Sequence, residues 1–185
     1  KVQGKVHSST ECFVKAVSLD HTWSTAWHHL GYSLGSTNQK QALVCGRFLG
    51  KKDCYIKAIE LSPKCSLSWY SLGATLDKDE IAIVSGKSCT QYECFLKTVN
   101  LDSLDAEAWS RIGKTLPENE PHVLVRGKIY TRLQCQLQAI LLEKNCDLAW
   151  NYLGEILNNK ETIDLNGENF SSRKCYKKLW RSALF

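Results

Sequence analysis

The chain of 185 residues contains no methionine, only three prolines, and no apolar run close to the roughly 20 residues that a membrane-spanning helix needs. It also lacks a secretory signal pattern, a nucleophile elbow, a phosphate-binding loop, Cys-x-x-Cys spacing and paired catalytic carboxylates. We therefore expect no membrane span, no catalytic or metal-ligating residue and no cofactor, and a protein that is not an enzyme. A catalytic domain outside these residues is the alternative.

Positive charge is present but scattered. The net charge is +5, and basic residues alternate with acidic ones along most of the chain. Only Arg173-Lys174 and Lys177-Lys178 form a cluster, which is smaller than the basic footprint of a nucleic-acid-binding protein. A solvated helix face accounts for this cluster, so we predict no nucleic-acid partner.

Three markers recur in phase at steps of 40 to 42 residues. They are a tryptophan (Trp27, Trp69, Trp109, Trp150), a cysteine (Cys12, Cys54, Cys94, Cys135, Cys175) and a glycine eight residues before each cysteine (Gly4, Gly46, Gly86, Gly127, Gly167). A fixed period of this length indicates a repeat architecture, in which each unit is stabilised by its neighbours.

The glycine of each repeat follows a short β-branched or aliphatic run, as in Ala-Ile-Val-Ser85-Gly86. This pattern predicts a β-hairpin with a type I′ turn, in which both turn residues have φ > 0. Asn166-Gly167 fits this turn best, and Arg126-Gly127 fits it least because arginine rarely adopts positive φ. We expect strands of about three residues, packed on helices or on the next hairpin, since an isolated hairpin is only marginally stable.

Two helices are expected around each hairpin. The helix with the cysteine follows a capping signal such as Thr131-x-x-Gln134. Cys54, Ala58 and Leu61 share one face of it, so the cysteine is expected in the core as a small apolar residue. The other helix has the pattern Trp-x-x-Leu-Gly-x-x-Leu, with the tryptophan expected in the core. A glycine inside a helix costs about 1 kcal/mol relative to alanine, so its recurrence predicts close approach of a second helix.

At these residues the chain resembles the tetratricopeptide-repeat (TPR) family. The W-x-x-L-G-x-x-Y pattern of that family's first helix is matched by Trp69, Leu72 and Gly73, with Leu76 in place of the tyrosine. The second helix of the family is matched by Tyr55, Ala58 and the exit Leu61-Ser62-Pro63. The family repeat has about 34 residues, so the hairpin between the two helices is an insertion.

The resemblance implies a mainly α fold, an αα-superhelix (a TPR-like solenoid) with a short β-hairpin inserted in each repeat. It covers residues 1–185 as a single repeat array of about four and a half units. Both ends of the sequence cut the repeat, so we expect a fragment of a longer array.

In the family, the first helix of each repeat lines a concave groove that binds peptides. The resemblance places the residue after each tryptophan, and the residue four positions further, on the exposed side of that helix. The candidate groove residues are His28, Tyr32, Tyr70, Ser110, Lys114, Asn151 and Glu155. An ordinary solvated face is the alternative for all of them.

We therefore expect a non-enzymatic protein–protein interaction scaffold whose partner is a protein or peptide. The alternative is a structural subunit of a fibre or surface assembly, in which exposed hairpin edges support self-association.

The nine cysteines bear on the compartment of the protein. Buried, reduced thiols favour a cytoplasmic location. Cys54 and Cys65, like Cys135 and Cys146, are eleven residues apart, and disulfides between them would place the protein outside the cell or on its surface. Asn169-Phe170-Ser171 is a glycosylation sequon, although Ser171 is also accounted for as a helix cap.

Overall fold

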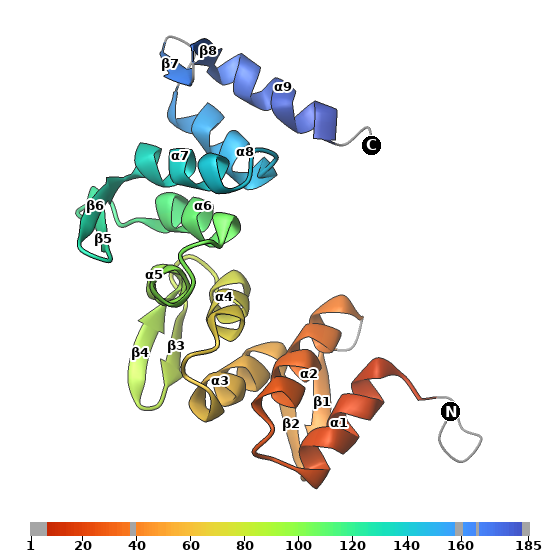
Figure 1. Cartoon of the computed structure of the whole chain (residues 1–185). Helices are drawn as coiled ribbons and strands as arrows, with labels where there is room; N and C mark the ends of the chain where they lie inside the picture. The colour runs from red at the N-terminus through yellow and green to blue at the C-terminus, as the bar shows by residue number, and fades with distance from the viewer. Residues whose placement is uncertain (1–6, 38–39, 158–160, 166, 183–185) are drawn as a thin grey trace. The chain divides into compact units, whose positions relative to one another are not determined.

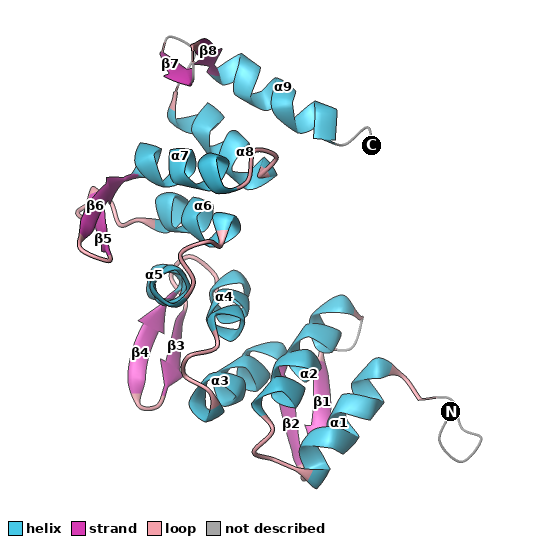
Figure 2. Ribbon diagram, viewed as in Figure 1, coloured by secondary structure: helices cyan, strands magenta, loops and turns pink. Residues whose placement is uncertain are grey.

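The structure is a computed structural model that describes residues 7–37, 40–157, 161–165 and 167–182. In this part of the chain, helices alternate with two-stranded antiparallel hairpins in a recurring order (Figures 1 and 2). The helices are α1 (Ser9–Leu19), α2 (Ser24–Ser36), α3 (Lys51–Leu61), α4 (Ser66–Thr75), α5 (Gln91–Leu101), α6 (Ala106–Thr115), α7 (Arg132–Leu142), α8 (Asp147–Ile156) and α9 (Ser172–Ser182). The strands are β1 (Gln41–Val44), β2 (Arg47–Gly50), β3 (Ile81–Val84), β4 (Lys87–Thr90), β5 (His122–Val125), β6 (Lys128–Thr131), β7 (Thr162–Leu165) and β8 (Glu168–Ser171).

The predicted helix–hairpin–helix unit is confirmed. A tryptophan helix (α2, α4, α6 or α8) is followed by a hairpin and then by a cysteine helix (α3, α5, α7 or α9). Helix α1 is a further cysteine helix that comes before the first complete unit. No helix in the described residues is long and apolar enough to cross a membrane.

The chain divides into two compact units, Lys1–Cys94 and Phe95–Phe185, and the boundary falls within α5. In the first unit, Trp27, Leu30 and Leu34 of α2 form a core with Val17 of α1 and Cys54 of α3. In the second unit, Trp150, Leu153 and Leu157 of α8 pack with Phe170 of β8 and Cys175 of α9. Each core therefore joins a tryptophan helix to the hairpin and cysteine helix that follow it.

Each hairpin packs one face on the helices and exposes the other. In β1, Ala42 and Val44 are buried while the residues between and before them are exposed, and β3 and β5 repeat this alternation. The strands have four residues each, one more than expected. Among the described residues, every hairpin is a separate sheet whose strands pair only with each other.

The hairpin turns have the positive backbone angles that a type I′ turn requires. The first turn residues, Cys45, Ser85 and Arg126, have φ of 47°, 50° and 49°. The glycines that follow have φ of 81°, 76° and 80°. Asn166, expected to fit this turn best, lies outside the described residues.

Arg126 adopts the turn although it was expected to fit least. Its guanidinium donates hydrogen bonds to Ser103 Oγ (2.8 Å) and to the Asn100 carbonyl (3.3 Å). These contacts tie the turn to the end of α5 and to the connection that follows it. We attribute the tolerance of positive φ at this arginine to these tertiary hydrogen bonds.

The cysteine helices begin at the predicted caps. Ser8 and Glu11 form a reciprocal capping box, as do Thr131 and Gln134. At Gly50 only half of the motif exists, because the Asp53 carboxylate accepts from the Gly50 amide (2.8 Å) and glycine has no side chain to return the bond.

The four repeat tryptophans, Trp27, Trp69, Trp109 and Trp150, lie in the core, at 2–6% exposure, as predicted. Each indole Nε1 also donates to the carbonyl six residues earlier, in the loop that enters its helix. The acceptors are His21 (2.9 Å), Pro63 (2.9 Å), Ser103 (2.9 Å) and Lys144 (2.8 Å). The tryptophan therefore anchors the connection between consecutive repeats as well as filling the core.

The glycine in the tryptophan helix marks a close helix approach, also as predicted. A Cβ at Gly31 would lie 2.8 Å from the ring of Tyr55, and one at Gly154 would lie 2.8 Å from the ring of Tyr176. At Gly113 it would meet Gln136 and lie 2.9 Å from Cys135 Cβ. Only a residue without a side chain fits at these contacts.

Candidate functional site

The seven predicted groove residues all lie on tryptophan helices. His28 and Tyr32 are on α2 and Tyr70 is on α4, in the first unit. Ser110 and Lys114 are on α6, and Asn151 and Glu155 are on α8, in the second unit. Each set splits between core and surface: His28 and Ser110 are buried, whereas Lys114, Asn151 and Glu155 form one surface group.

His28 is buried, so the expectation that the residue after the tryptophan faces solvent is wrong there. Its ring lies 5.4 Å from that of Tyr55, and its Nδ1 is 3.2 Å from Ser68 Oγ. Burial lowers the pKa of the His28 imidazole, and the neighbouring His29 lowers it further. The side chain is thus a neutral core group that joins α2 to α3 and α4.

Tyr32, one turn further along α2, is 63% exposed and meets the original expectation of a surface residue. Tyr70 is half-buried on α4. The accessible part of the predicted face in the first unit is therefore smaller than expected, with Tyr32 as its most exposed member.

Ser110 is also buried, and it too corrects the expected orientation. Its hydroxyl donates to Gln136 Oε1 (2.8 Å), and Gln136 Nε2 donates to the Ser110 carbonyl (3.0 Å). Both side chains are 0% exposed. This reciprocal pair satisfies two polar groups inside the contact between α6 and α7, so Ser110 is a packing residue.

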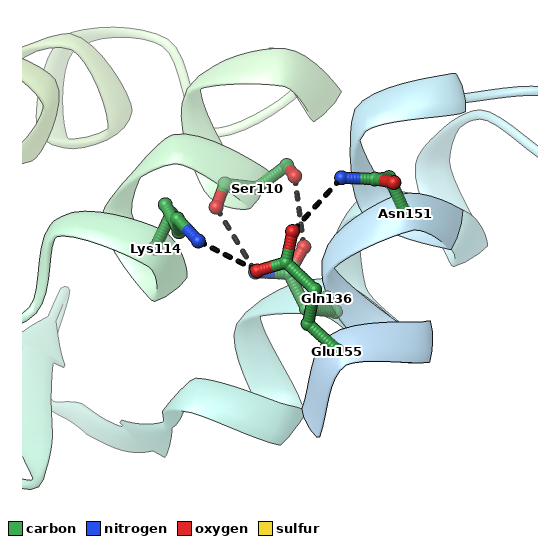
Figure 3. A network of polar contacts seen from close by, with 5 residues as sticks. All are labelled: Ser110, Lys114, Gln136, Asn151 and Glu155. Atoms are coloured by element: carbon green, nitrogen blue, oxygen red, sulfur yellow. Dashed lines mark hydrogen bonds and ion pairs between the residues drawn. The ribbon is translucent and has the colours of Figure 1, made fainter. Parts of the chain in front are cut away.

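Lys114, Asn151 and Glu155 form a polar cluster on the surface of the second unit (Figure 3). Lys114 Nζ lies 2.6 Å from Glu155 Oε2, and Asn151 Nδ2 donates to Glu155 Oε1 (3.1 Å). The ammonium group also lies 4.9 Å from the centre of the Tyr152 ring. Lys114 and Glu155 occupy the same position in neighbouring repeats, so the cluster joins α6 to α8.

We call Lys114, Asn151, Tyr152 and Glu155 the α6–α8 polar face. The Lys114 and Glu155 side chains remain 49% and 42% exposed, so each charge keeps access to solvent while it contacts the other. An exposed ion pair of this kind contributes only about 0–1 kcal/mol to stability, so a competing partner can displace it at little cost.

The thiols do not supply a nucleophile in the cores. Burial raises the pKa of Cys54, Cys94 and Cys135 to about 12. A protonated thiol is a weak nucleophile and a poor metal ligand. The described residues also contain no group of three or more His, Cys, Asp or Glu side chains that could hold a metal ion.

Two members of these contacts were not predicted, Gln136 and Tyr152. Gln136 follows the cysteine of α7, a position held by Phe13, Tyr55, Phe95 and Tyr176 in the other cysteine helices. A polar residue at a position that is aromatic in the other four helices was the signal that could have predicted a buried hydrogen bond at Gln136. Nothing in the sequence pattern distinguishes Tyr152, because its neighbour Lys114 comes from the preceding repeat.

A search against protein-family models and curated proteins finds no match to this chain.

Proposed function

We propose that this chain is a non-enzymatic protein-interaction scaffold built from TPR-like repeats, stacked as an αα-superhelix, and that its tryptophan helices bind a protein or peptide. The α6–α8 polar face carries the proposal. Its side chains differ in charge and polarity, and they lie on helices whose apolar core recurs from repeat to repeat. When a partner breaks the Lys114–Glu155 ion pair, the Lys114 ammonium can donate hydrogen bonds to it and the Glu155 carboxylate can accept them.

A peptide phage library selected on the whole chain tests this proposal. Peptides that bind the α6–α8 polar face are expected to bind the Lys114→Glu and Glu155→Lys variants at least about tenfold more weakly, since each change reverses a contacted charge. Lys97→Glu is the matched control, because this exposed lysine lies on the cysteine helix α5. Selected peptides that bind all three variants as tightly as the original chain would contradict the proposal.

A structural subunit of a fibre or surface assembly is the second candidate. One observation favours it: the outward cross-strand pairs Leu43–Phe48 and Leu124–Ile129 are apolar and 53–69% exposed. Exposed apolar hairpins support association between copies. Analytical ultracentrifugation over a concentration series tests this candidate, with Phe48→Ser and Ile129→Ser expected to reduce self-association.

A further inference from the structure

A shallow hollow of about 280 Å³ lies between strand β6 and helix α7, within the second unit. Its apolar lining comes from Ile129 on β6 and from Leu137 and Leu141 on α7. Ile129 is 66% exposed and Leu141 is 76% exposed, so both are open to solvent. Strand β6 leads directly into α7 (Figure 1), and we call the hollow between them the β6–α7 groove.

The backbone of β6 has an unpaired donor and acceptor at Ile129. Val125 and Lys128 flank the two-residue turn, so they exchange hydrogen bonds with each other. Leu124 and Ile129 form the next pair of the ladder, which is a non-hydrogen-bonded pair. The amide and carbonyl of Ile129 therefore point away from β5, toward the free edge of β6.

A hydrogen bond at the end of β6 shows that this free edge faces the groove. Thr131 belongs to the next non-hydrogen-bonded pair, with His122, so its amide points to the same side as that of Ile129. The Thr131 amide donates to Gln134 Oε1 (2.9 Å), and Gln134 lines the groove. The Ile129 amide and carbonyl have no hydrogen-bond partner among the described residues. The groove thus offers one donor and one acceptor of a strand edge beside an apolar helix face.

The apolar face of α7 is particular to this repeat. At the position of Leu141, α3 has Glu60 and α5 has Asn100. Both polar side chains bond within their own helix, because Glu60 pairs with Lys57 (3.6 Å) and Asn100 Nδ2 donates to the Leu96 carbonyl (2.9 Å). The repeat therefore accepts a polar residue here, and packing within the fold does not account for the exposed leucine.

The charge at the groove has one sign. Among the described side chains that line it, Lys128 is the only charged one, and it has no ion pair with the described residues. Larger hollows lie beside Trp27 (about 510 Å³) and Trp150 (about 590 Å³), but each is lined by two carboxylates and two Lys or Arg side chains. Charge complementarity therefore favours an acidic group in a ligand of the β6–α7 groove only.

We propose that the β6–α7 groove binds an extended peptide segment as an added antiparallel strand. The backbone of the segment exchanges two hydrogen bonds with Ile129. Because side chains alternate along a strand, the two peptide residues that flank this contact both turn toward α7. The one opposite Tyr130 is apolar and packs on the leucines of α7. The one opposite Lys128 is acidic and pairs with its ammonium group.

A second copy of the chain matches this groove less well. If β6 of each copy paired through the same edge, the Lys128 ammonium groups of both copies would share the groove with no acid between them. The groove also shares no residue with the α6–α8 polar face. It is therefore a separate binding site from the one in the proposed function.

Fluorescence polarisation of the whole chain with a labelled peptide tests the backbone contact. The probe has seven residues, with leucine, valine and glutamate in this order at its centre and threonine at the flanking positions. N-methylation of the valine should weaken binding at least about fivefold, since it removes the amide that donates to the Ile129 carbonyl. N-methylation of the glutamate is the matched control, because its amide points away from β6 and binding should persist.

Variants of the chain test the side-chain contacts. Leu141→Asn, which copies the residue of α5, should bind the probe about five- to tenfold more weakly because it removes apolar surface. Leu104→Asn is the matched control, at a leucine of the same unit that is 74% exposed and lies outside the groove. Lys128→Glu should bind the probe about tenfold more weakly, and a probe with lysine in place of glutamate should restore its binding.

The proposal is wrong if the original chain does not bind the probe, or if the two N-methylated probes bind equally well. Equal binding by Leu141→Asn and Leu104→Asn would exclude the groove as the site. Sedimentation velocity examines the other occupant, and self-association that Leu141→Asn abolishes would assign the groove to a second copy instead. Circular dichroism melting of each variant checks that the fold is intact. The Lys114→Glu variant keeps the groove and should bind the probe normally, which separates this result from the proposed function.

Discussion

At the scale of single residues, the side chain that follows the cysteine decides how each pair of helices packs. In α3 this residue is Tyr55, whose ring covers Gly31 of α2. In α9 it is Tyr176, whose ring covers Gly154 of α8. In α7 it is Gln136, which covers Gly113 and also pairs with Ser110. The same backbone contact is thus filled by an aromatic face in some repeats and by a hydrogen-bonded amide in another.

This arrangement predicts the effect of adding a methyl group at Gly113. Gly113→Ala should lower the free energy of unfolding by about 1–3 kcal/mol, because the new Cβ would lie 2.9 Å from Cys135 Cβ and would also meet the Gln136 amide. The helix propensity of alanine, worth about 1 kcal/mol, only partly offsets the clash. Urea denaturation followed by circular dichroism measures the difference.

Gly35→Ala is the matched control, since the nearest atom to its Cβ would be Lys51 Cδ at 3.8 Å. It should be neutral or slightly stabilising. Equal losses at both glycines would show that the close contact at Gly113 does not determine the cost.

Residue-level predictions from the sequence failed where the neighbouring helix was decisive. Periodicity correctly assigned Trp27 and Leu30 to the core. The TPR resemblance assigned His28 and Ser110 to the surface, and the helical period could not correct this because it gives one buried face and no information about a second contact. In α2 and α6 a neighbouring helix buries the residue after the tryptophan: Tyr55 of α3 packs against His28, and Gln136 of α7 pairs with Ser110.

At the scale of elements, the hairpins were the most predictable part. A β-branched run, a turn residue with glycine, and a second short run fixed both strands and the register, since a two-residue loop allows only one pairing. The turn at Arg126 was judged unfavourable because local preference was the only information available. Its stabilising partners, Ser103 and Asn100, are 23 and 26 residues earlier in the chain.

The same comparison predicts opposite effects of one substitution in two hairpins. Ser85→Asn should raise the free energy of unfolding by about 0.5 kcal/mol, because asparagine followed by glycine is preferred in a type I′ turn. Arg126→Asn gains the same turn preference but loses two hydrogen bonds from its guanidinium, so it should lower stability by about 1 kcal/mol. Denaturant midpoints of the two variants measure the contrast, and a gain in both would show that the Arg126 contacts do not stabilise the fold.

At the scale of the whole molecule, the recurring unit could be predicted because three markers stay in phase over every copy. The hollows beside Trp27 and Trp150 could not. They depend on side chains from two cysteine helices, a hairpin and the tryptophan itself. A period identifies equivalent positions, whereas the space left between their side chains depends on the size of each residue.

The cysteines give a prediction for the complete chain. All nine are free thiols in the structure: Cys12 and Cys45 are exposed, Cys65 and Cys89 are partly buried, and five are buried (Cys54, Cys94, Cys135, Cys146 and Cys175). Cys12 departs from the expected burial of the repeat cysteine, because no described helix precedes α1 to cover it. Its four counterparts in the later cysteine helices lie in the core.

Alkylation of the native protein at pH 8, followed by intact mass measurement, should therefore label the two exposed cysteines first and the two partly buried ones more slowly. The five buried thiols should react only after unfolding, because burial raises the pKa of Cys54, Cys94 and Cys135 to about 12 and leaves almost no thiolate at this pH. The Cys12→Ser, Cys45→Ser variant is the control, and it should lose only the fast phase.

The number of thiols labelled in denaturant tests the compartment. Nine labels without reductant would support a cytoplasmic location. Five labels, rising to nine with reductant, would instead indicate disulfides such as Cys54–Cys65 and Cys135–Cys146, and would favour the extracellular assembly over the reduced scaffold.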